Sequence, residues 1–260
     1  MGQGMGKKAL TVCITGASSG IGMACARLFA ARGDRLLLCA RRRDRLQALA
    51  HELQQRFGTK SLVVALDVRL RSQVEEKLGH LPDAWSAVDV LINNAGLALG
   101  KDPAHAADVE HWDQMVDTNL KGLAYVTRVL LPGMVQRDAG HIINIGSIAG
   151  RETYAGGSVY CATKHAVRAF SSALRMDLLG TNIRISSVDP GFVETEFSLV
   201  RFEGNATKAA EVYRGMRPLR AEDVAEAVMF CVERPAHVNV SEILLMPVDQ
   251  AAVGQIYRGR

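Results

Sequence analysis

The sequence lacks any long hydrophobic run: no apolar stretch in its 260 residues approaches the roughly 20 residues that a membrane-spanning helix requires. Its first eight residues, MGQGMGKK, lack the apolar core of a signal peptide, and Gly6 stands where N-myristoylation requires Ser or Thr. These absences argue against a secreted or membrane-anchored protein. We therefore expect a cytoplasmic protein with a flexible leader at residues 1–8 and no membrane partner.

Metal-binding, disulfide and nucleic-acid-binding patterns are also missing. The five cysteines form no C-x-x-C motif, and the seven histidines are not spaced as metal ligands. The formal net charge is only +4, and no extended basic stripe is present, which counts against a nucleic-acid-binding protein. The sequence therefore predicts buried, reduced thiols, no bound metal and no nucleic-acid partner.

What the sequence does contain is a regular alternation of strand-like and helix-like segments. Amphipathic stretches such as residues 43–57, 109–131, 158–179 and 223–232 separate short apolar runs at residues 10–15, 35–40, 61–66, 88–92, 141–145, 183–188 and 243–246. This alternation predicts an α/β fold with a Rossmann-type, doubly wound parallel β-sheet and helices on both faces. Because no repeat, low-complexity tract or linker interrupts it, we predict a single domain over residues 9–248.

Two segments fall outside this rhythm. Residues 192–217 interrupt the alternation after the sixth predicted strand, at the carboxyl edge of a doubly wound sheet, so we predict that they form a lid over a ligand site. Residues 249–260, DQAAVGQIYRGR, look too polar for a core element. We predict that they form a C-terminal arm toward a neighbouring subunit.

A glycine-rich turn follows the first predicted strand and precedes a helical pattern, which is the order that a dinucleotide site requires. Its residues are Gly16, Ala17, Ser18, Ser19, Gly20, Ile21 and Gly22. Gly16 would allow the tight turn, Gly20 the approach of backbone amides to a pyrophosphate, and Gly22 the close packing of helix on strand. The spacing G-x-x-x-G-x-G differs from the commonest fingerprint, G-x-G-x-x-G. A loop that merely needs several positive φ angles is therefore the alternative.

The end of the second predicted strand indicates which dinucleotide binds. Sites for NAD carry an acidic residue there, whereas this chain has three successive arginines and no carboxylate. Arg41, with Arg42 as a second anchor, can hold a 2′-phosphate through charge-assisted hydrogen bonds, so the predicted cofactor is NADP(H). Arg43 is expected to lie in solvent. The alternatives are a solvated helix start or a basic nucleic-acid patch.

Tyr160 and Lys164 lie four residues apart, and Ser147 precedes them. In a helix, this spacing puts the phenol and the ammonium group on one face. A positive charge about 4 Å away would favour the phenolate by about 4 kcal/mol at an effective dielectric constant of ~20, which lowers the phenol pKa by at most about three units before desolvation. The pair therefore predicts a general acid/base. Singly, Ser147 could merely end a strand and Lys164 could be a solvated charge.

Together these motifs resemble the short-chain dehydrogenase/reductase family. The resemblance covers about residues 9–248, where the motifs have the order and spacing found in that family. These motifs are TGASSGIG, Asn93-Asn94-Ala95-Gly96, Asn119, Ser147, Tyr160 with Lys164, and Pro190-Gly191. The stretches NNAGLALG, YAGGSVY, FSLVRFEGN and RPAHVNV resemble one subgroup, the bacterial NADP-dependent 3-hydroxy acid dehydrogenases. Members of this subgroup are also described as serine or allo-threonine dehydrogenases and malonic semialdehyde reductases.

The resemblance implies a role for each of these residues. Tyr160 would exchange the proton of the substrate alcohol, Ser147 would hold the substrate oxygen, and Lys164 would lower the tyrosine pKa and bind the nicotinamide ribose. Asn119 would hold a water in the proton path. Further coenzyme contacts would come from Asp67, Val68, Asn93, Asn94, Ala95, Gly96, Pro190, Gly191, Val193 and Thr195. The resemblance also implies a homotetramer formed through the predicted helices at 109–131 and 158–179.

The substrate of such an enzyme carries a carboxylate, which requires a cationic partner in the pocket. Arg201, within the predicted lid, is the first candidate, whereas Lys208, Arg214 and Arg151 are weaker ones. All four could instead be surface charges. Two other functions stay open at this point: reduction of a different small carbonyl such as sulfoacetaldehyde, and non-catalytic binding of NADPH by a sensor.

Overall fold

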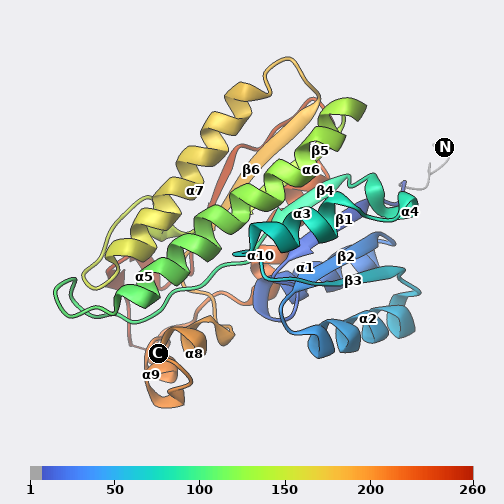
Figure 1. Ribbon diagram of the computed structural model, residues 1–260. Coiled ribbons are helices and arrows are strands. Elements are labelled where there is room, and N and C mark those ends of the chain that lie inside the picture. The colour runs from blue at the N-terminus through green and yellow to red at the C-terminus, as the bar shows by residue number, and fades with distance from the viewer. Residues whose placement is uncertain (1–7, 260) are drawn as a thin grey trace, which may run out of the picture.

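The predicted parallel sheet is present and has seven strands in the order β3-β2-β1-β4-β5-β6-β7 (Figure 1). The computed structural model describes residues 8–259, so residues 1–7 of the predicted leader lie outside the described residues. Each neighbouring pair of strands in this sheet runs parallel. The strands are β1 (Thr11–Thr15), β2 (Arg35–Ala40), β3 (Ser61–Ala65), β4 (Val90–Asn93), β5 (Gly140–Ile145), β6 (Ile183–Pro190) and β7 (Glu242–Leu245).

Helices cover both faces of the sheet, as the alternation predicts. One face carries α1 (Gly20–Ala31), α2 (Arg43–Phe57) and α10 (Ala221–Val232). The opposite face carries α3 (Arg71–Gly79), α6 (Leu123–Arg137) and α7 (Ser158–Asp177). The shorter elements are α4 (Asp83–Ser86), α5 (Val109–Val116), the π-helical turn η1 (Asp117–Gly122), the 3₁₀ turn η2 (Ile148–Gly150), α8 (Glu196–Arg201), α9 (Ala206–Glu211), β8 (Gln250–Ala252) and β9 (Gln255–Ile256).

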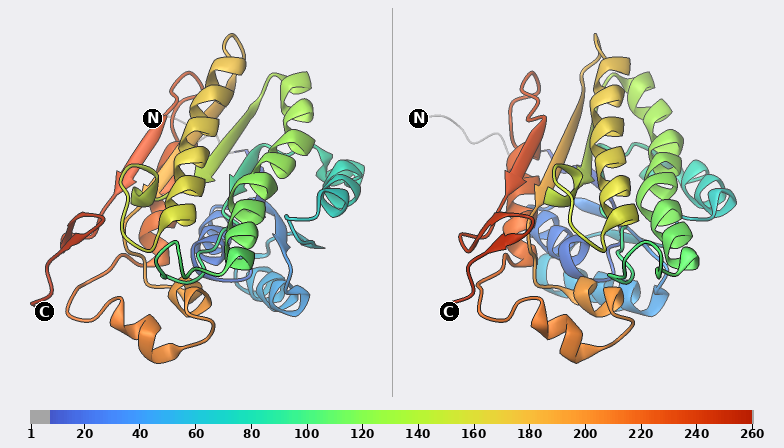
Figure 2. Two further views of the ribbon diagram at one scale, coloured as in Figure 1. Left: turned by 60° about the vertical axis from the view of Figure 1, so that its left-hand side comes forward. Right: turned by 90° about the vertical axis from the view of Figure 1, so that its left-hand side faces the viewer.

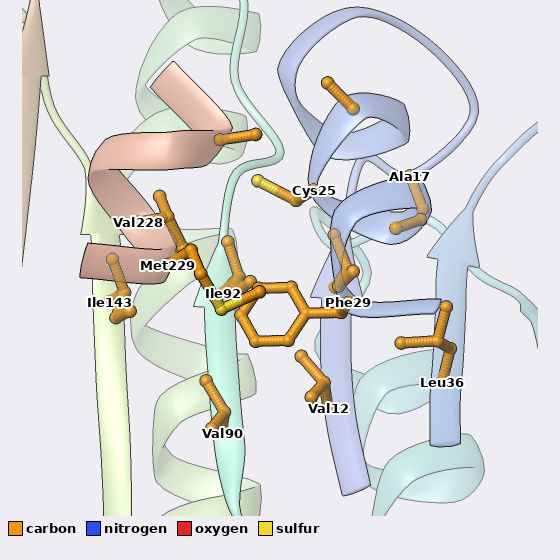
Figure 3. Close-up of a cluster of buried hydrophobic side chains, with 14 of the residues drawn as sticks. Val12, Ala17, Cys25, Phe29, Leu36, Val90, Ile92, Ile143, Val228 and Met229 are labelled. Carbon is orange, nitrogen blue, oxygen red and sulfur yellow. The ribbon is translucent and has the colours of Figure 1, made fainter. Parts of the chain in front are cut away.

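Two hydrophobic layers hold the helices to the sheet. Because side chains alternate along a strand, Val12 and Ile14 of β1 face one layer, whereas Cys13 faces the other. Phe29 of α1 is fully buried in the first layer, among strand side chains that include Val12 and Ile92 (Figure 3). Truncating such a side chain to alanine costs about 3–5 kcal/mol. This packing fixes the position of α1 and, with it, of the glycine-rich turn that opens the helix.

The predicted fold class is confirmed, and each predicted strand occurs with small shifts at its ends. The amphipathic stretch predicted at residues 109–131 is divided into α5, η1 and α6, and it continues to Arg137. Asp138, with a φ of 48°, ends this helical run in the left-handed region. The π-helical turn lies around Asn119, and such turns frequently occur at functional sites.

The predicted lid, residues 192–217, and the C-terminal segment lie together at one end of the molecule (Figure 2). The predicted C-terminal arm forms a β8–β9 hairpin, which also contacts its own chain. The Gln250 Oε1 atom accepts a hydrogen bond from the Phe192 amide at 2.8 Å, and the Val253 amide donates to Glu152 at 2.8 Å. The buried Gln250 side chain is thus hydrogen-bonded to the protein instead of to water, which allows a polar segment to pack here.

Within residues 8–259, no helix is both long and apolar enough to cross a membrane. The same residues contain no group of three or more His, Cys, Asp or Glu side chains arranged to hold a metal ion. The five cysteines are buried free thiols.

Candidate active site

A cavity of about 980 Å³ opens at the carboxyl edge of the sheet. Its walls come from the glycine-rich turn, the segments that follow the strands, α7, the lid and the C-terminal hairpin. Sheets of this type bind dinucleotides where the strand order reverses, and here that point lies between β1 and β4. The volume is at the upper end of the range of about 300–1,000 Å³ for small-molecule sites, which suits a large ligand such as a dinucleotide.

The glycine-rich turn is shaped by its glycines and held by Asn94. Gly16 and Gly20 have positive φ angles of 66° and 50°. A Cβ atom on Gly22 would lie 2.5 Å from both the Asn94 Nδ2 atom and the Gly16 carbonyl oxygen, so no other residue fits. Asn94 Nδ2 donates to the carbonyl of Thr15 at 2.9 Å, which fixes the turn to the end of β4. Since the turn opens α1 beside the cavity, the amides of the first helical turn form an anion site.

The arginines after β2 lie beside this turn. The Arg42 Nη2 atom donates to the Ser19 Oγ atom at 2.9 Å and to the Ser18 Oγ atom at 3.1 Å. Arg41 is exposed and lines the cavity, whereas Arg43 is exposed outside it, as predicted. Two cations and two hydroxyl groups therefore converge where the sequence predicts a 2′-phosphate.

Most of the other predicted coenzyme contacts also line the cavity. Asp67 and Val68 follow β3 there, and Asp67 forms an ion pair with Arg69 at 2.7 Å. Burial acts to raise the pKa of Asp67, but the hydrogen bonds from Arg69 outweigh it, so the net pKa is lowered. The remaining predicted contacts on the cavity wall are Ile21, Asn94, Ala95, Gly96, Pro190, Gly191, Val193 and Thr195.

Three predicted catalytic side chains meet at the centre of the cavity. Ser147 follows β5 and caps η2, and Tyr160 and Lys164 lie one turn apart in α7. Lys164 Nζ donates to the carbonyl of Ile145 at 2.9 Å and lies 6.0 Å from the centroid of the Tyr160 ring. Packing also requires Gly150, because a Cβ atom there would lie 2.6 Å from the Lys164 carbonyl oxygen.

The pKa of Tyr160 differs from the prediction. Burial raises the pKa of Tyr160, and Tyr154 adds to this, whereas the neighbouring Ser147 hydroxyl and the Arg201 charge lower it by less. Burial also lowers the pKa of Lys164 to about 8, although the Asp189 carboxylate acts in the opposite direction. The predicted lowering of the phenol pKa was an upper limit before desolvation, and desolvation outweighs it here.

Arg201 lines the cavity near Tyr160 and Tyr154. Its guanidinium carbon is 5.9 Å from the centroid of the Tyr160 ring and 5.4 Å from that of Tyr154. The Tyr154 hydroxyl is buried without a hydrogen-bond partner among the described atoms, and its ring also lines the cavity. Tyr154 was not predicted as a site residue, although it opens the stretch YAGGSVY, which ends in the catalytic tyrosine. An arginine and a free hydroxyl group together form a site for an anion.

The family model of the short chain dehydrogenases matches residues 10–205. The chain belongs to the short-chain dehydrogenase family. A relative named NADP-dependent 3-hydroxy acid dehydrogenase YdfG, from Salmonella typhimurium, is 51% identical over 246 residues, which cover 94% of this chain and 98% of the relative. The sulfoacetaldehyde reductase 2 of Chromohalobacter salexigens is 47% identical and covers 92% of this chain and 95% of its own. The closed form of serine dehydrogenase complexed with NADP+ superposes with a TM-score of 0.90 at 50% identity, over 94% of this chain and 98% of that one.

Two of the predicted site residues do not line the cavity. Asn93 is buried, and its Nδ2 atom donates to the side chains of Thr127 and Asn144 at 3.0 and 2.9 Å. The Asn119 side chain does not line the cavity either. It pairs with Leu97, whose amide donates to Oδ1 and whose carbonyl accepts from Nδ2, both at 2.8 Å. Asn119 thus holds the Leu97 backbone of a short-chain dehydrogenase site in place, and Asn93 links Thr127 of α6 to Asn144 of β5. The role of Asn119 in holding a water stays a prediction.

Two of the candidate cations for the substrate carboxylate are already paired with acidic side chains of the protein. Arg151 is paired with the carboxylates of Asp189 and Glu242, each at 2.6 Å, and does not line the cavity. Arg214 is paired with Glu211 within the lid, also outside the cavity wall. Lys208 lines the cavity but is an exposed side chain. Arg201 is therefore the candidate that the geometry of this family member favours.

Proposed function

We propose that the chain is a cytoplasmic NADP-dependent oxidoreductase that transfers hydride between the nicotinamide and a small 3-hydroxy acid or its semialdehyde, of the serine, allo-threonine or 3-hydroxypropionate type. The observation that carries the substrate class is the position of Arg201, 5.9 Å from the Tyr160 ring centroid in the same cavity. A carboxylate held by Arg201 and the Tyr154 hydroxyl would leave the hydroxyl group of a short acid beside Ser147 and Tyr160. The printed names of the 3-hydroxy acid and serine dehydrogenases agree with this substrate class.

NADP(H), when bound, supplies the hydride chemistry, and Arg41, Arg42 and Ser18 would hold its 2′-phosphate. Ser147 donates a hydrogen bond to the substrate oxygen and stabilises negative charge there. Because burial raises the pKa of Tyr160, the phenol is protonated at neutral pH and can donate its proton to a carbonyl. In the direction of alcohol oxidation, Tyr160 must instead accept the proton.

A second candidate is reduction of sulfoacetaldehyde, which the relative from Chromohalobacter salexigens favours. A sulfonate would meet the same Arg201 guanidinium and the same Tyr154 hydroxyl. A non-catalytic NADPH sensor is less well supported, because binding alone does not require a serine, a tyrosine and a lysine at one point.

The test is the change in NADPH absorbance with a panel of substrates in both directions. The panel contains L-serine, L-allo-threonine, 3-hydroxypropionate, malonic semialdehyde, sulfoacetaldehyde and a neutral aldehyde. We expect Arg201→Ala to raise KM for the acids far more than for the neutral aldehyde, and Tyr160→Phe to abolish turnover while NADPH still binds. Arg214→Ala, in the same lid but outside the cavity wall, is the matched control. Equal effects of Arg201→Ala on acids and on the neutral aldehyde would contradict the assigned substrate class.

We also infer that the protein is a homotetramer built on the helical segments at residues 109–131 and 158–179. Exposed apolar side chains in these segments support the proposal: Val109 is 60% exposed, Met176 73% and Leu179 89%. Such side chains are expected to be covered by a neighbouring copy. Sedimentation equilibrium tests the assembly directly, and a monomeric mass would contradict it.

A further inference from the structure

The lid helix α8 is held at both of its ends. At its last residue, the Arg201 Nε atom donates to the carbonyl of Gly100 at 3.0 Å, and the Gly100 amide donates to the Arg201 carbonyl at 3.0 Å. At its first residue, Glu196 accepts hydrogen bonds from Arg42 at 3.0 Å and from Arg45 at 2.7 Å. Glu196 and Arg201 both line the cavity, so α8 forms a strap along it. The Arg201 end lies at the substrate, and the Glu196 end lies at the arginines assigned to the 2′-phosphate.

Arg42 connects this strap to the glycine-rich turn. Its Nη1 atom donates to Glu196, while its Nη2 atom donates to Ser18 and Ser19. A continuous series of hydrogen bonds therefore runs from the turn, through one guanidinium group, to the lid. Hydrogen bonds from Arg45 and Arg42 outweigh the effect of burial on the pKa of Glu196, so this pKa is lowered and the carboxylate is ionised at neutral pH.

We infer that Glu196 is a positioning residue that latches the lid across the adenosine end of the cavity, so that NADP(H) is released only when the ion pairs with Arg42 and Arg45 open. The inference rests on the proposed function, which places NADP(H) in this cavity. The side chains in these pairs are 41% to 49% exposed, so each pair contributes modestly. The effect should therefore appear in the rate of release, which the latch limits, rather than as a large loss of affinity.

Release of NADPH can be followed by stopped-flow fluorescence when excess NADP+ displaces it from the full chain. We expect Glu196→Gln to raise the release rate about three- to tenfold, the size expected for two exposed ion pairs. Arg45→Gln should do the same, because Arg45 pairs with Glu196 but does not line the cavity. The double variant should release NADPH no faster than Glu196→Gln alone, since both changes break one interaction.

Glu211→Gln is the matched control, because Glu211 lies in the same lid and lines the same cavity but pairs with Arg214 of its own segment. Its release rate should equal that of the unmodified protein. Hydrogen exchange of the α8 amides, measured without coenzyme, provides a second readout, and it should accelerate in Glu196→Gln and Arg45→Gln.

Three results would overturn the inference, and they have different meanings. Release rates of both variants within about twofold of the unmodified protein, with normal NADPH binding, would refute the latch alone. A faster release in Glu196→Gln, without any change in Arg45→Gln or in exchange of α8, would show that Glu196 acts on the coenzyme directly. Failure of the unmodified protein to bind NADPH would overturn the proposed function together with the latch.

Discussion

Lys164 places a charge in a buried position, and its replacement by methionine should remove a pH dependence of stability. The side chain is 7% exposed, and its ammonium group donates to the Ile145 carbonyl at 2.9 Å. Burial lowers the pKa of Lys164 from 10.5 to about 8. The fold therefore disfavours the charged form of a lysine that the catalytic site requires.

The sign and the size of the effect follow from proton linkage. Below pH 8 the lysine is charged in both the folded and the unfolded chain, and burial of the charge destabilises the folded chain by its full amount. Between pH 8 and pH 10.5 the folded chain releases this proton while the unfolded chain keeps it, so stability rises with pH. At about 1.36 kcal/mol per pKa unit, the full shift corresponds to about 3 kcal/mol, of which about 2 kcal/mol develops between about pH 7 and 9.5.

The assay is thermal unfolding of the unmodified protein and of Lys164→Met at these two pH values. The difference between the two Tm values should change by roughly 4–8 °C, because about 2 kcal/mol has this effect in a chain of this size. At pH 7 the variant should be up to about 2 kcal/mol more stable, since the loss of the donor to the Ile145 carbonyl offsets part of the gain. Lys208→Met, at an exposed lysine of the same cavity, is the control and should leave the pH dependence unchanged. If Lys164→Met and the unmodified protein showed parallel pH dependences, the reasoning would be refuted.

Three further substitutions test the site. Gly150→Ala should destabilise the protein by about 1–3 kcal/mol and lower kcat, because the new Cβ atom meets the α7 backbone. The control is Gly79→Ala, where the nearest atom to the new Cβ lies 3.8 Å away. Equal Tm and kcat values in the two variants would contradict the predicted clash. Arg41→Gln should weaken NADPH binding about 10- to 100-fold through loss of a charged hydrogen bond, while NADH binding stays the same, as titration by fluorescence would show. Tyr154→Phe should raise KM for acids about fivefold and leave neutral aldehydes unaffected, and an unchanged KM for acids would exclude the hydroxyl from the site.

Much of the fold could be predicted because its signals are local. A strand covered on both faces reads as a continuous apolar run, and β2, RLLLCA, has five of its six residues buried. The π-helical turn η1 could not be predicted in this way. It differs from an α-helix by one extra residue in a turn, and the stretch DTNLKG is compatible with either geometry. The sequence therefore indicated a helix there but not the turn that brings Asn119 to the Leu97 backbone.

In the site, too, features within a short stretch of sequence could be predicted, whereas contacts between distant residues could not. Gly16, Gly20 and the pair of Tyr160 and Lys164 were predicted because they belong to short sequence motifs, although their contacts in the structure, such as that of Lys164 with Ile145, reach distant residues. The contact of Glu196 with Arg45 joins residues 151 positions apart, and no local pattern indicates it. The contacts of the hairpin at β8 are also of long range. Gln250 accepts from the Phe192 amide, and the Val253 amide donates to the Glu152 carboxylate, and composition does not show such contacts.

The two arginines considered for the substrate carboxylate show why such contacts decide function. The sequence ranks Arg201 above Arg151 only by its place in the predicted lid, and it does not show which of the two charges is already paired. Parallel pairing of β6 with β7 brings the carboxylates of Asp189 and Glu242 to Arg151, which neutralises it. Arg201 donates from its Nε atom to the Gly100 carbonyl and is paired with no carboxylate among the described ion pairs, so its terminal amino groups keep their capacity to bind an anion. The availability of a cation for a ligand is thus a property of the sheet order and the lid, and it becomes visible only in the folded chain.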